Sequence, residues 1–505
     1  MKAREAFVIG AGPNGFTAAI LLAKAGLQTT ILEAESAVGG GTRSEELTLP
    51  GFVHDLCSAV HPLAVSSPAF AGFPLADHGL EWIQPPIPLA HPFDDGSAAI
   101  LYRSLQDTST ALGIDGAAYA RVLTPLVNRW PEVAREVLQP ILHVPRSPLL
   151  LARFGWQGLW PASTAARRLF RTPKARALFA GLAAHSVLPL DAPGSAAFGW
   201  ILAIAGHAAG WPIPRGGSQR IADALASYFT SLGGKIVTGT RVRSLDDFED
   251  RLESAKGAEH TAERLRNWPA PRSVLRQFLK RDALVLCGLT PQQFLEIAGT
   301  RLPESFRNKL RRYRYGPGVF KIDWALKQPV PWTAPECAHA GTLHLGGSLD
   351  EIELAEKQAA TGVISERPFV LFVQPSIFDA SRAPGGMHTA WAYCHVPHSS
   401  NIDMTSRIEA QVERFAPGFS GAILARHTFT PGEMEQHNAN LVGGDISGGL
   451  NSLWQLTFRP TASLYRTPLK NVYLCSASTP PGGGVHGMCG YHAARRALRD
   501  RNVLK

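Results

Sequence analysis

The chain has 505 residues, and its content of 45% hydrophobic and 18% charged residues allows two or three domains with large apolar cores. A net charge of +9 would suit an acidic partner, but the sequence has no basic arm, zinc-finger spacing or RNA-binding aromatic motif, which argues against nucleic acid. The six cysteines are scattered without a C-x-x-C pair, and no apolar run has bilayer length, so we expect a cytoplasmic protein without a metal site, secretory peptide or membrane span.

The first thirty residues carry the strongest functional signal. In "AFVIGAGPNGFTAAILLAKAGLQTTILEAE", residues 6–9 are predicted to form a buried strand. Gly10, Gly12 and Gly15 follow, in a spacing that allows a tight turn, close approach of backbone to a pyrophosphate and close packing of a helix on the strand. Glu33 ends a second predicted strand, where its carboxylate can accept hydrogen bonds from ribose hydroxyls and disfavours a 2′-phosphate. The pattern predicts a dinucleotide site that does not bind NADP.

A second glycine cluster at residues 39–41, followed by Arg43, favours FAD over NAD. In FAD enzymes with glycines at this place, the backbone wraps the pyrophosphate from the far side, which NAD dehydrogenases do not require. The planar guanidinium of Arg43 suits a phosphate or the flavin, and the alternative is a solvated loop arginine. The predicted cofactor-binding residues of this region are Gly10, Gly12, Pro13, Asn14, Gly15, Glu33, Ala34, Gly40, Gly41 and Arg43.

Residues 146–176 combine basic and aromatic side chains, and no acidic residue occurs between Glu136 and Asp191. Two interpretations are open. The segment could contact an anionic membrane surface, with cations on headgroups and aromatic rings at the boundary, which would make the protein peripheral to a membrane. Alternatively, it forms a helical cap whose apolar stripe is core. The side chains concerned are Arg146, Arg153, Trp156, Trp160, Arg167, Arg168, Arg171, Lys174 and Arg176.

Two later segments are predicted to be strands beside a cavity. In "GVFKIDWALK", the alternation places Lys321 and Asp323 on one face, opposite Ile322 and Trp324. In "HTAWAYCHV", Trp391, Tyr393 and His395 share a face, where they would bound a flat apolar substrate or simply cover a sheet.

Near the C-terminus, "NVYLCSASTPPGGGVHGMCGYHAARRAL" repeats the glycine spacing between a predicted strand and a predicted helix. No following strand with a ribose-binding acid is present, so a second nucleotide site fails. We predict instead that the helix start at Gly487, Met488 and Cys489 stabilises the negative charge of reduced flavin, with Ser476 as a further cofactor contact. The alternative is a structural glycine-rich turn.

These segments, together with "GFVHDLCSAVHPLA" and "PRGGSQRIADALASYFTSLGGKI", resemble the phytoene desaturase group. That group contains carotenoid desaturases and isomerases and retinol saturase-like proteins, within the FAD-dependent amine oxidase-like superfamily. The resemblance implies an α/β fold with a Rossmann-type, p-hydroxybenzoate-hydroxylase-like FAD domain in three pieces and an inserted α+β substrate domain with a helical cap. The implied boundaries are 1–75, 212–300 and 440–505 for the FAD domain, and 76–211 and 301–439 for the substrate domain.

The sequence departs from the group in three places. Residues 475–479 read "CSAST", where the superfamily often has Gly-Ala or Gly-Glu before the last loop. Many relatives have arginine directly after the glycine doublet, where this chain has Gly41, with Arg43 two residues on. The charged segment 246–281 has the character of an insertion, and no role is assigned to it.

The resemblance also implies roles for single residues. Val242 would meet the adenine side through its backbone, and residues 55–61 would lie near the flavin. Lys321 falls near the lysine that amine oxidases place, through water, at flavin N5; the alternative is a surface lysine. His61 and His486 are candidate general bases, or structural histidines. With Tyr393, these three are the candidate catalytic residues.

The leading hypothesis is an FAD-dependent oxidoreductase that moves a hydride from a C–H bond of a hydrophobic substrate to flavin N5 and leaves a C=C bond. The reverse saturation and a redox-neutral isomerisation use the same scaffold. A flavin amine oxidase and a non-catalytic lipid-binding escort are the alternatives. The substrate, the electron acceptor and the oligomeric state do not follow from the sequence.

Overall fold

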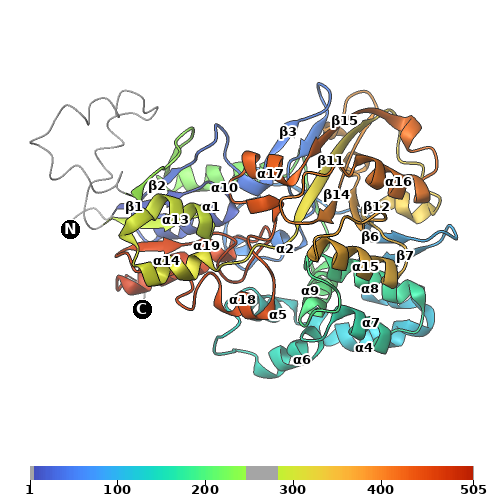
Figure 1. Ribbon diagram of the computed structural model, residues 1–505, viewed down its shortest axis with the longest axis horizontal. Helices are drawn as coiled ribbons and strands as arrows, with labels where there is room; N and C mark the ends of the chain where they lie inside the picture. Colours follow the sequence, from blue (N-terminus) through green and yellow to red (C-terminus); the bar gives the residue numbers. More distant parts are fainter. Residues whose placement is uncertain (1–4, 246–282, 504–505) are drawn as a thin grey trace, which may run out of the picture.

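A parallel five-stranded sheet carries both ends of the chain in the computed structural model, which describes residues 5–245 and 283–503 (Figure 1). The proposed insertion at 246–281 lies outside the described residues. In spatial order the strands are β9 (Lys235–Val237), β2 (Gln28–Leu32), β1 (Glu5–Ile9), β10 (Leu284–Cys287) and β16 (Val472–Leu474).

Strand alternation distributes this sheet's side chains between two helical layers. Ala6 and Val8 face one apolar cluster, which includes residues of α1 (Pro13–Lys24), α10 (Gln219–Ser231) and α19 (Met488–Asp500). Ile9 faces the other, formed with α13 (Pro291–Ala298) and α14 (Glu304–Arg311). A parallel sheet covered on both faces by helices is the predicted Rossmann-type α/β arrangement.

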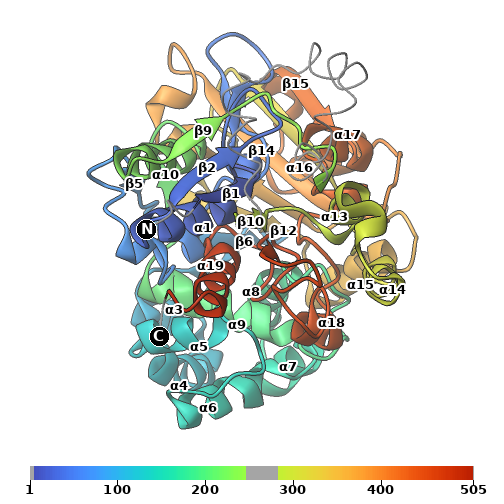
Figure 2. The ribbon, with the colours of Figure 1, turned by 90° about the vertical axis from the view of Figure 1, so that its left-hand side faces the viewer.

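Helices α1 and α19 bring the two ends of the chain together (Figure 2). A Cβ atom on Gly490 would lie 1.8 Å from the carbonyl oxygen of Asn14, so only glycine permits this helix crossing. Gly15 is equally constrained, because a Cβ there would lie 1.9 Å from the carbonyl oxygen of Gly10. The first and last thirty residues therefore meet, as the prediction of one shared flavin site requires.

The second large sheet is mixed and has seven strands (Figure 1). Its order is β15 (Ile423–Phe429), β11 (Gly318–Leu326), β14 (His388–Val396), β13 (Val370–Val373), β12 (Ala340–Leu345), β6 (Ile87–Pro92) and β7 (Ala98–Leu101). On one face, Ile322 and Trp324 pack against Ile408 of α16 (Thr405–Phe415). Lys321 and Tyr393 are paired across the strands on the opposite face.

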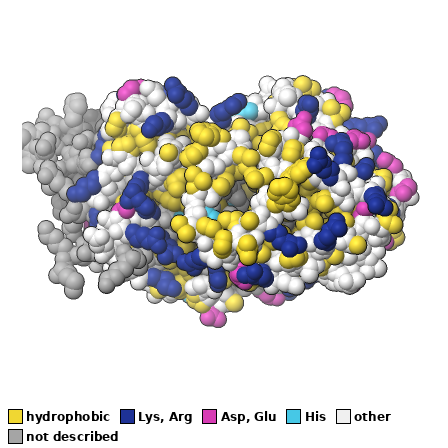
Figure 3. Space-filling model, turned by 90° about the horizontal axis from the view of Figure 1, so that it is seen from below, with side chains coloured by type: hydrophobic (Ala, Val, Ile, Leu, Met, Phe, Trp, Pro, Cys, Tyr) yellow, Lys and Arg dark blue, Asp and Glu magenta, His cyan; other side chains and the backbone are white. Residues whose placement is uncertain are grey.

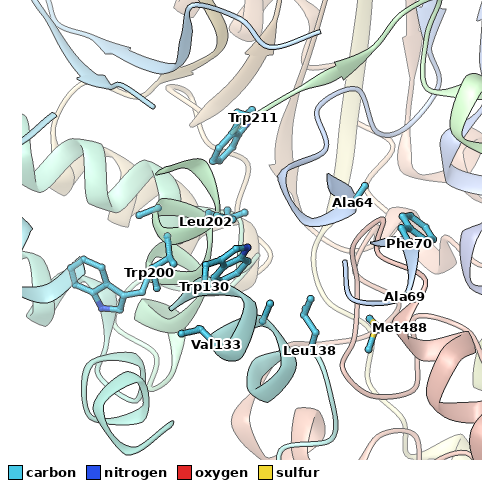
Figure 4. Packing of buried hydrophobic residues seen from close by; sticks show 14 of the residues in the cluster. Ala64, Ala69, Phe70, Trp130, Val133, Leu138, Trp200, Leu202, Trp211 and Met488 are labelled. Carbon is cyan, nitrogen blue, oxygen red and sulfur yellow. The ribbon is translucent and has the colours of Figure 1, made fainter. Parts of the chain in front are cut away.

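Helices cover the lower part of the molecule in Figure 1. They are α3 (Leu105–Ala111), α4 (Gly116–Val127), α5 (Trp130–Val137), α6 (Pro148–Gly158), α7 (Ala162–Leu169), α8 (Pro173–Ala184) and α9 (Ser195–Ala208). Figure 4 shows Trp130 of α5 close to Leu202 of α9, while Phe70 lies beside Met488 in the same apolar cluster. The helical layer and the C-terminal loop thus share a core.

The remaining strands and α-helices of the described chain are β3 (Ser44–Glu46), β4 (Val53–Asp55), α2 (Pro62–Val65), β5 (Trp82–Ile83), β8 (Ile213–Pro214), α15 (Leu349–Ala360), α17 (Pro431–His437) and α18 (Leu453–Phe458). All strands of the parallel sheet fall within the three segments predicted for an FAD domain, whose exact boundaries stay a prediction. Among the described residues, we find no helix that is both long and apolar enough to cross a bilayer.

Candidate functional site

One cavity of about 870 Å³ extends from the Gly10–Gly15 turn to the helical layer. The carboxyl ends of β1 and β2, one face of the seven-stranded sheet, and helices α5, α6 and α9 contribute to its walls. The predicted site residues that line it are Gly10, Gly12, Pro13, Asn14, Gly15, Glu33, Ala34, Gly40, Gly41, Arg43, His61, Val242, Tyr393, Ser476 and His486. Lys321, Gly487, Met488 and Cys489 do not line it.

The two N-terminal glycine clusters pack against each other at one end of this cavity. A Cβ on Gly40 would lie 3.2 Å from the Cα of Gly12, and Gly12 caps helix α1 without a side-chain bond. The first N–H groups of α1 are therefore not capped by a side chain, and the Asn14 side-chain oxygen is buried without a partner. A turn of this kind fits an anionic phosphate group at the helix start.

Glu33 is held rigidly at the end of β2. Its Oε2 accepts the Ala11 N–H at 2.7 Å, and its Oε1 accepts the Glu35 N–H at 3.0 Å. Val242 lies along the same end of the cavity. The carboxylate is thus fixed where the ribose of a dinucleotide would need an acceptor.

Arg43 is 5% exposed, so the interpretation as a solvated loop arginine is wrong. Its Nη2 contacts the His437 ring and donates to the His437 carbonyl oxygen at 3.1 Å, but its Nε has no partner. Burial, followed by the charges of Arg43 and Lys321, lowers the pKa of His437 to about 4. A buried cation that lines the cavity suits an anionic or electron-rich ligand.

Lys321 is 1% exposed, so the alternative of a surface lysine is also wrong. Its ammonium group pairs with the Asp323 carboxylate and lies 5.6 Å from the ring centres of both Trp391 and Phe429. Asp323 in turn lies 3.6 Å from Nδ1 of His54. Burial raises the pKa of Asp323 to about 6, although Lys321 opposes the shift. The pair forms a buried charge cluster behind the cavity wall.

His61 lines the cavity, and one of its ring nitrogens is buried without a hydrogen-bond partner. Its Nε2 lies 2.8 Å from the Ser218 hydroxyl, whose proton goes to the Ser58 carbonyl oxygen at 2.5 Å. Because that hydroxyl has one proton, Nε2–H must be the donor to Ser218, which leaves Nδ1 as a bare acceptor. Nδ1 has no partner, and burial lowers the pKa of His61 to about 4 while Asp55 opposes the shift. The ring is a neutral, positioned base.

His486 is held differently. Its Nδ1 accepts the Met488 N–H at 3.0 Å, and hydrogen bonds to the backbone at Gly483 and Gly482 oppose the burial that lowers its pKa to about 4. The ring therefore fixes the shape of the C-terminal loop. It also uses the Met488 N–H, one of the groups that we predicted for the flavin. The residues of this loop that do line the cavity are Ser476, Ala477, Pro481, Gly483, Gly484, Val485 and His486.

Trp391 and Tyr393 share one face of β14, as predicted, and both line the cavity. Their rings stack on each other, with centres 5.6 Å apart and planes at 21°. They form a continuous flat wall, because no ligand fits between rings at this separation.

Sequence reasoning missed the polar support behind His61. The Ser218 N–H donates to Asp55 Oδ1 at 2.7 Å. Arg382 pairs with the same carboxylate from more than 300 positions away. No local pattern marks Arg382 as a site residue.

Comparisons with known proteins agree with this geometry. Residues 8–73 match a family described as NAD(P)-binding Rossmann-like domain. The chain is 26% identical to pyridine nucleotide-disulfide oxidoreductase domain-containing protein 2 of Rattus norvegicus, over 98% of this chain and 93% of the rat protein. It is 24% identical to the lycopene-forming phytoene desaturase of Pseudescherichia vulneris, over 98% and 99% of the two chains. The solved structure of cyclohexylamine oxidase from Brevibacterium oxydans has the same fold, with a TM-score of 0.58 at 14% identity over 99% and 100% of the chains.

The predicted resemblance to the phytoene desaturase group is confirmed, as is the Rossmann-type α/β fold class, and the solved amine oxidase shares this fold. The chain is related to oxidoreductases with a flavin or nucleotide cofactor.

Proposed function

We propose that the protein is an FAD-dependent oxidoreductase that converts a CH–CH unit of a hydrophobic substrate into a C=C bond. One observation carries the proposal: a single cavity joins the glycine turns and Glu33 at one end to an apolar chamber at the other. The apolar lining includes Leu151, Phe154 and Ile201 from the helical layer and Val373 from the sheet. Such a chamber orients an apolar substrate and excludes water.

The N-terminal turn residues fit FAD. The backbone at Gly12 and the N-terminus of α1 would hold the pyrophosphate of FAD. Glu33 would bind the ribose, and Arg43 would contact an electron-rich edge of the cofactor. When bound, FAD supplies the acceptor for a hydride. Within the chain, Nδ1 of His61 takes the proton lost from the neighbouring carbon, and the Ser218 hydroxyl holds the imidazole in the required tautomer. The flat wall of Trp391 and Tyr393 orients the substrate.

An amine substrate is less well supported. A protonated amine needs a carboxylate or two aromatic rings that face each other across a gap. The rings of Trp391 and Tyr393 stack on each other instead. Glu136 lines the chamber, but its carboxylate already accepts the N–H groups of Arg146 and Ser147 and contacts His143. A cationic substrate would therefore lack a partner there.

The test is anaerobic reduction of the purified protein by candidate substrates. The visible spectrum and the nucleotide released by heating first establish whether FAD is bound. Bleaching of the flavin absorbance by polyenes or unsaturated lipids supports the proposal. Bleaching by amines alone would replace it with the amine oxidase alternative, and a colourless protein that binds lipid would favour the escort.

A further inference from the structure

The outward face of helix α6 presents two large apolar side chains with Arg153 between them, and no described residue covers these side chains. Leu149 is 86% exposed and Trp156 is 70% exposed, and they lie seven positions apart on one face of the helix. The opposite face, with Leu150 and Phe154, is buried in the main apolar cluster. Large apolar side chains on both sides of a helix normally contact an apolar layer on each side, and the described chain supplies only one such layer.

The exposed apolar surface continues on both sides of α6. The residues that form this surface, which we call the mouth patch, are Ile141, Leu142, Val144, Leu149, Trp156, Leu159 and Trp454. Gly194 lies between the α6 part of this patch and Trp454. Its N–H donates to the Leu159 carbonyl oxygen, and a Cβ on Gly194 would lie 2.6 Å from the side chain of Leu453, the neighbour of Trp454. Figure 3 shows hydrophobic side chains gathered around a hollow on this side of the molecule.

The cavity opens within the mouth patch. Ile141 and Leu159 are 48% and 58% exposed, and both also line the cavity. Leu453, next to Trp454, lines it as well. The apolar surface and the apolar chamber are therefore continuous.

The charge around the mouth patch is positive. Arg146 and Arg153 are exposed within the segment that contains no acidic residue between Glu136 and Asp191. Within the described ranges, neither arginine forms an ion pair. Arg167, which the sequence also offered for membrane contact, is instead paired with Asp350 and Glu353, each at 2.6 Å. Arg168 of the same helix forms no ion pair within the described ranges and lies over the Trp160 ring, which contacts Trp156, so it adds to the positive charge beside the mouth patch.

We propose that the mouth patch docks the protein onto an anionic lipid bilayer, with the cavity opening toward the acyl chains. Lipids supply both an apolar layer for Trp156 and Leu149 and negative headgroups for Arg146 and Arg153. A second copy of the chain would place the same arginines against one another, so charge disfavours self-association through this face. The docking requires no redox chemistry, and its test is independent of the proposed reaction.

The experiment is flotation of the full-length protein with vesicles of phosphatidylcholine containing 30% phosphatidylglycerol, and with vesicles of phosphatidylcholine alone. We expect binding to the anionic vesicles to fall about fivefold for each of Arg146→Gln and Arg153→Gln. Leu149→Ser combined with Trp156→Ser should abolish it. The matched control combines Leu354→Ser with Lys235→Gln. Leu354 is 56% exposed on α15, and Lys235 is exposed at the start of β9. This control variant should bind the vesicles like the unmodified protein.

Far-ultraviolet circular dichroism and the thermal transition identify any variant that fails to fold, and only folded variants are compared. Equal binding by the unmodified protein and the Leu149→Ser, Trp156→Ser variant would overturn the proposal. A dimer in sedimentation velocity that dissociates on Trp156→Ser would also overturn the proposal, because the mouth patch would then be an interface between two copies of this chain.

Discussion

Arg382 Nη2 donates to Asp55 Oδ2 at 2.8 Å, and both side chains are completely buried. Their partners make the pair part of the site: Asp55 Oδ1 also accepts the Ser44 hydroxyl and the Ser218 N–H, and Ser218 holds the His61 ring. The ion pair therefore connects the hairpin β3–β4, the loop before α10 and the wall of the cavity. It lowers the pKa of Asp55 against the effect of burial.

We expect Arg382→Met to reduce the free energy of unfolding by about 3–5 kcal/mol, because it leaves the Asp55 charge buried without its partner. Combining it with Asp55→Asn should restore part of that loss, since the uncompensated charge is removed. Urea denaturation of the single and double variants measures both values. A double variant that loses the full sum of the two single effects would show that the pair is not coupled.

Gly12→Ala should abolish binding of the proposed FAD while leaving the fold intact. Gly12 has ordinary backbone angles, with φ at −79° and ψ at 174°, and a Cβ there would lie 3.9 Å from the Cα of Gly40. The protein thus tolerates the methyl group, but the proposed pyrophosphate would not. The ratio of flavin to protein in purified material is the measurement, and Gly72→Ala, where a Cβ meets nothing within 4 Å, is the control. Full flavin content in Gly12→Ala would place the cofactor elsewhere.

The stability of the protein should fall in mild acid. Burial lowers the pKa values of His61, His91, His207 and His486 from 6.5 to about 4. Between pH 4 and pH 6.5 the unfolded chain therefore binds more protons than the folded chain. The free energy of unfolding is highest above about pH 6.5 and decreases as the pH falls toward 4. Urea denaturation at pH 7.5, 6 and 5 should show a progressive decrease. A free energy of unfolding that stays constant over this range would contradict the assignment of neutral buried histidines.

The N-terminal dinucleotide turn could be predicted because its signal is local. Strand, glycines, helix and Glu33 lie within thirty residues, and each has a steric or electrostatic requirement that few residue types meet. The face shared by Trp391 and Tyr393 followed equally from strand alternation.

The polar network around His61 could not be predicted in this way. Asp55, Ser218 and Arg382 come from three distant segments, and only the packing of the two sheets brings them together. The choice between a buried and a surface Lys321 stayed open for the same reason, since alternation gives the side that a residue faces but not what covers that side. The C-terminal loop was predicted as a whole, but the detail that His486 uses the Met488 N–H depends on a ring orientation that no spacing encodes.

His61→Gln should slow substrate-dependent flavin reduction by about 10²-fold or more without reducing flavin content, if Nδ1 accepts the proton in the rate-limiting step. The glutamine amide can still donate to the Ser218 hydroxyl, so the local fold is kept, but it cannot take up a proton. Ser218→Ala should reduce the rate of flavin reduction less, because the imidazole is still present as the base and only the hydroxyl that fixes its tautomer is lost.

The pH dependence separates a chemical role of His61 from a structural one. In the unmodified protein the rate of flavin reduction should fall as the pH drops through about 4, where Nδ1 becomes protonated, and this inflection should be absent from His61→Gln. Stopped-flow reduction over short exposures to each pH avoids the slower loss of structure in acid. A His61→Gln variant that keeps both the rate and the inflection would mean that the proton leaves by another route, as an allylic C–H bond with direct access to water would allow.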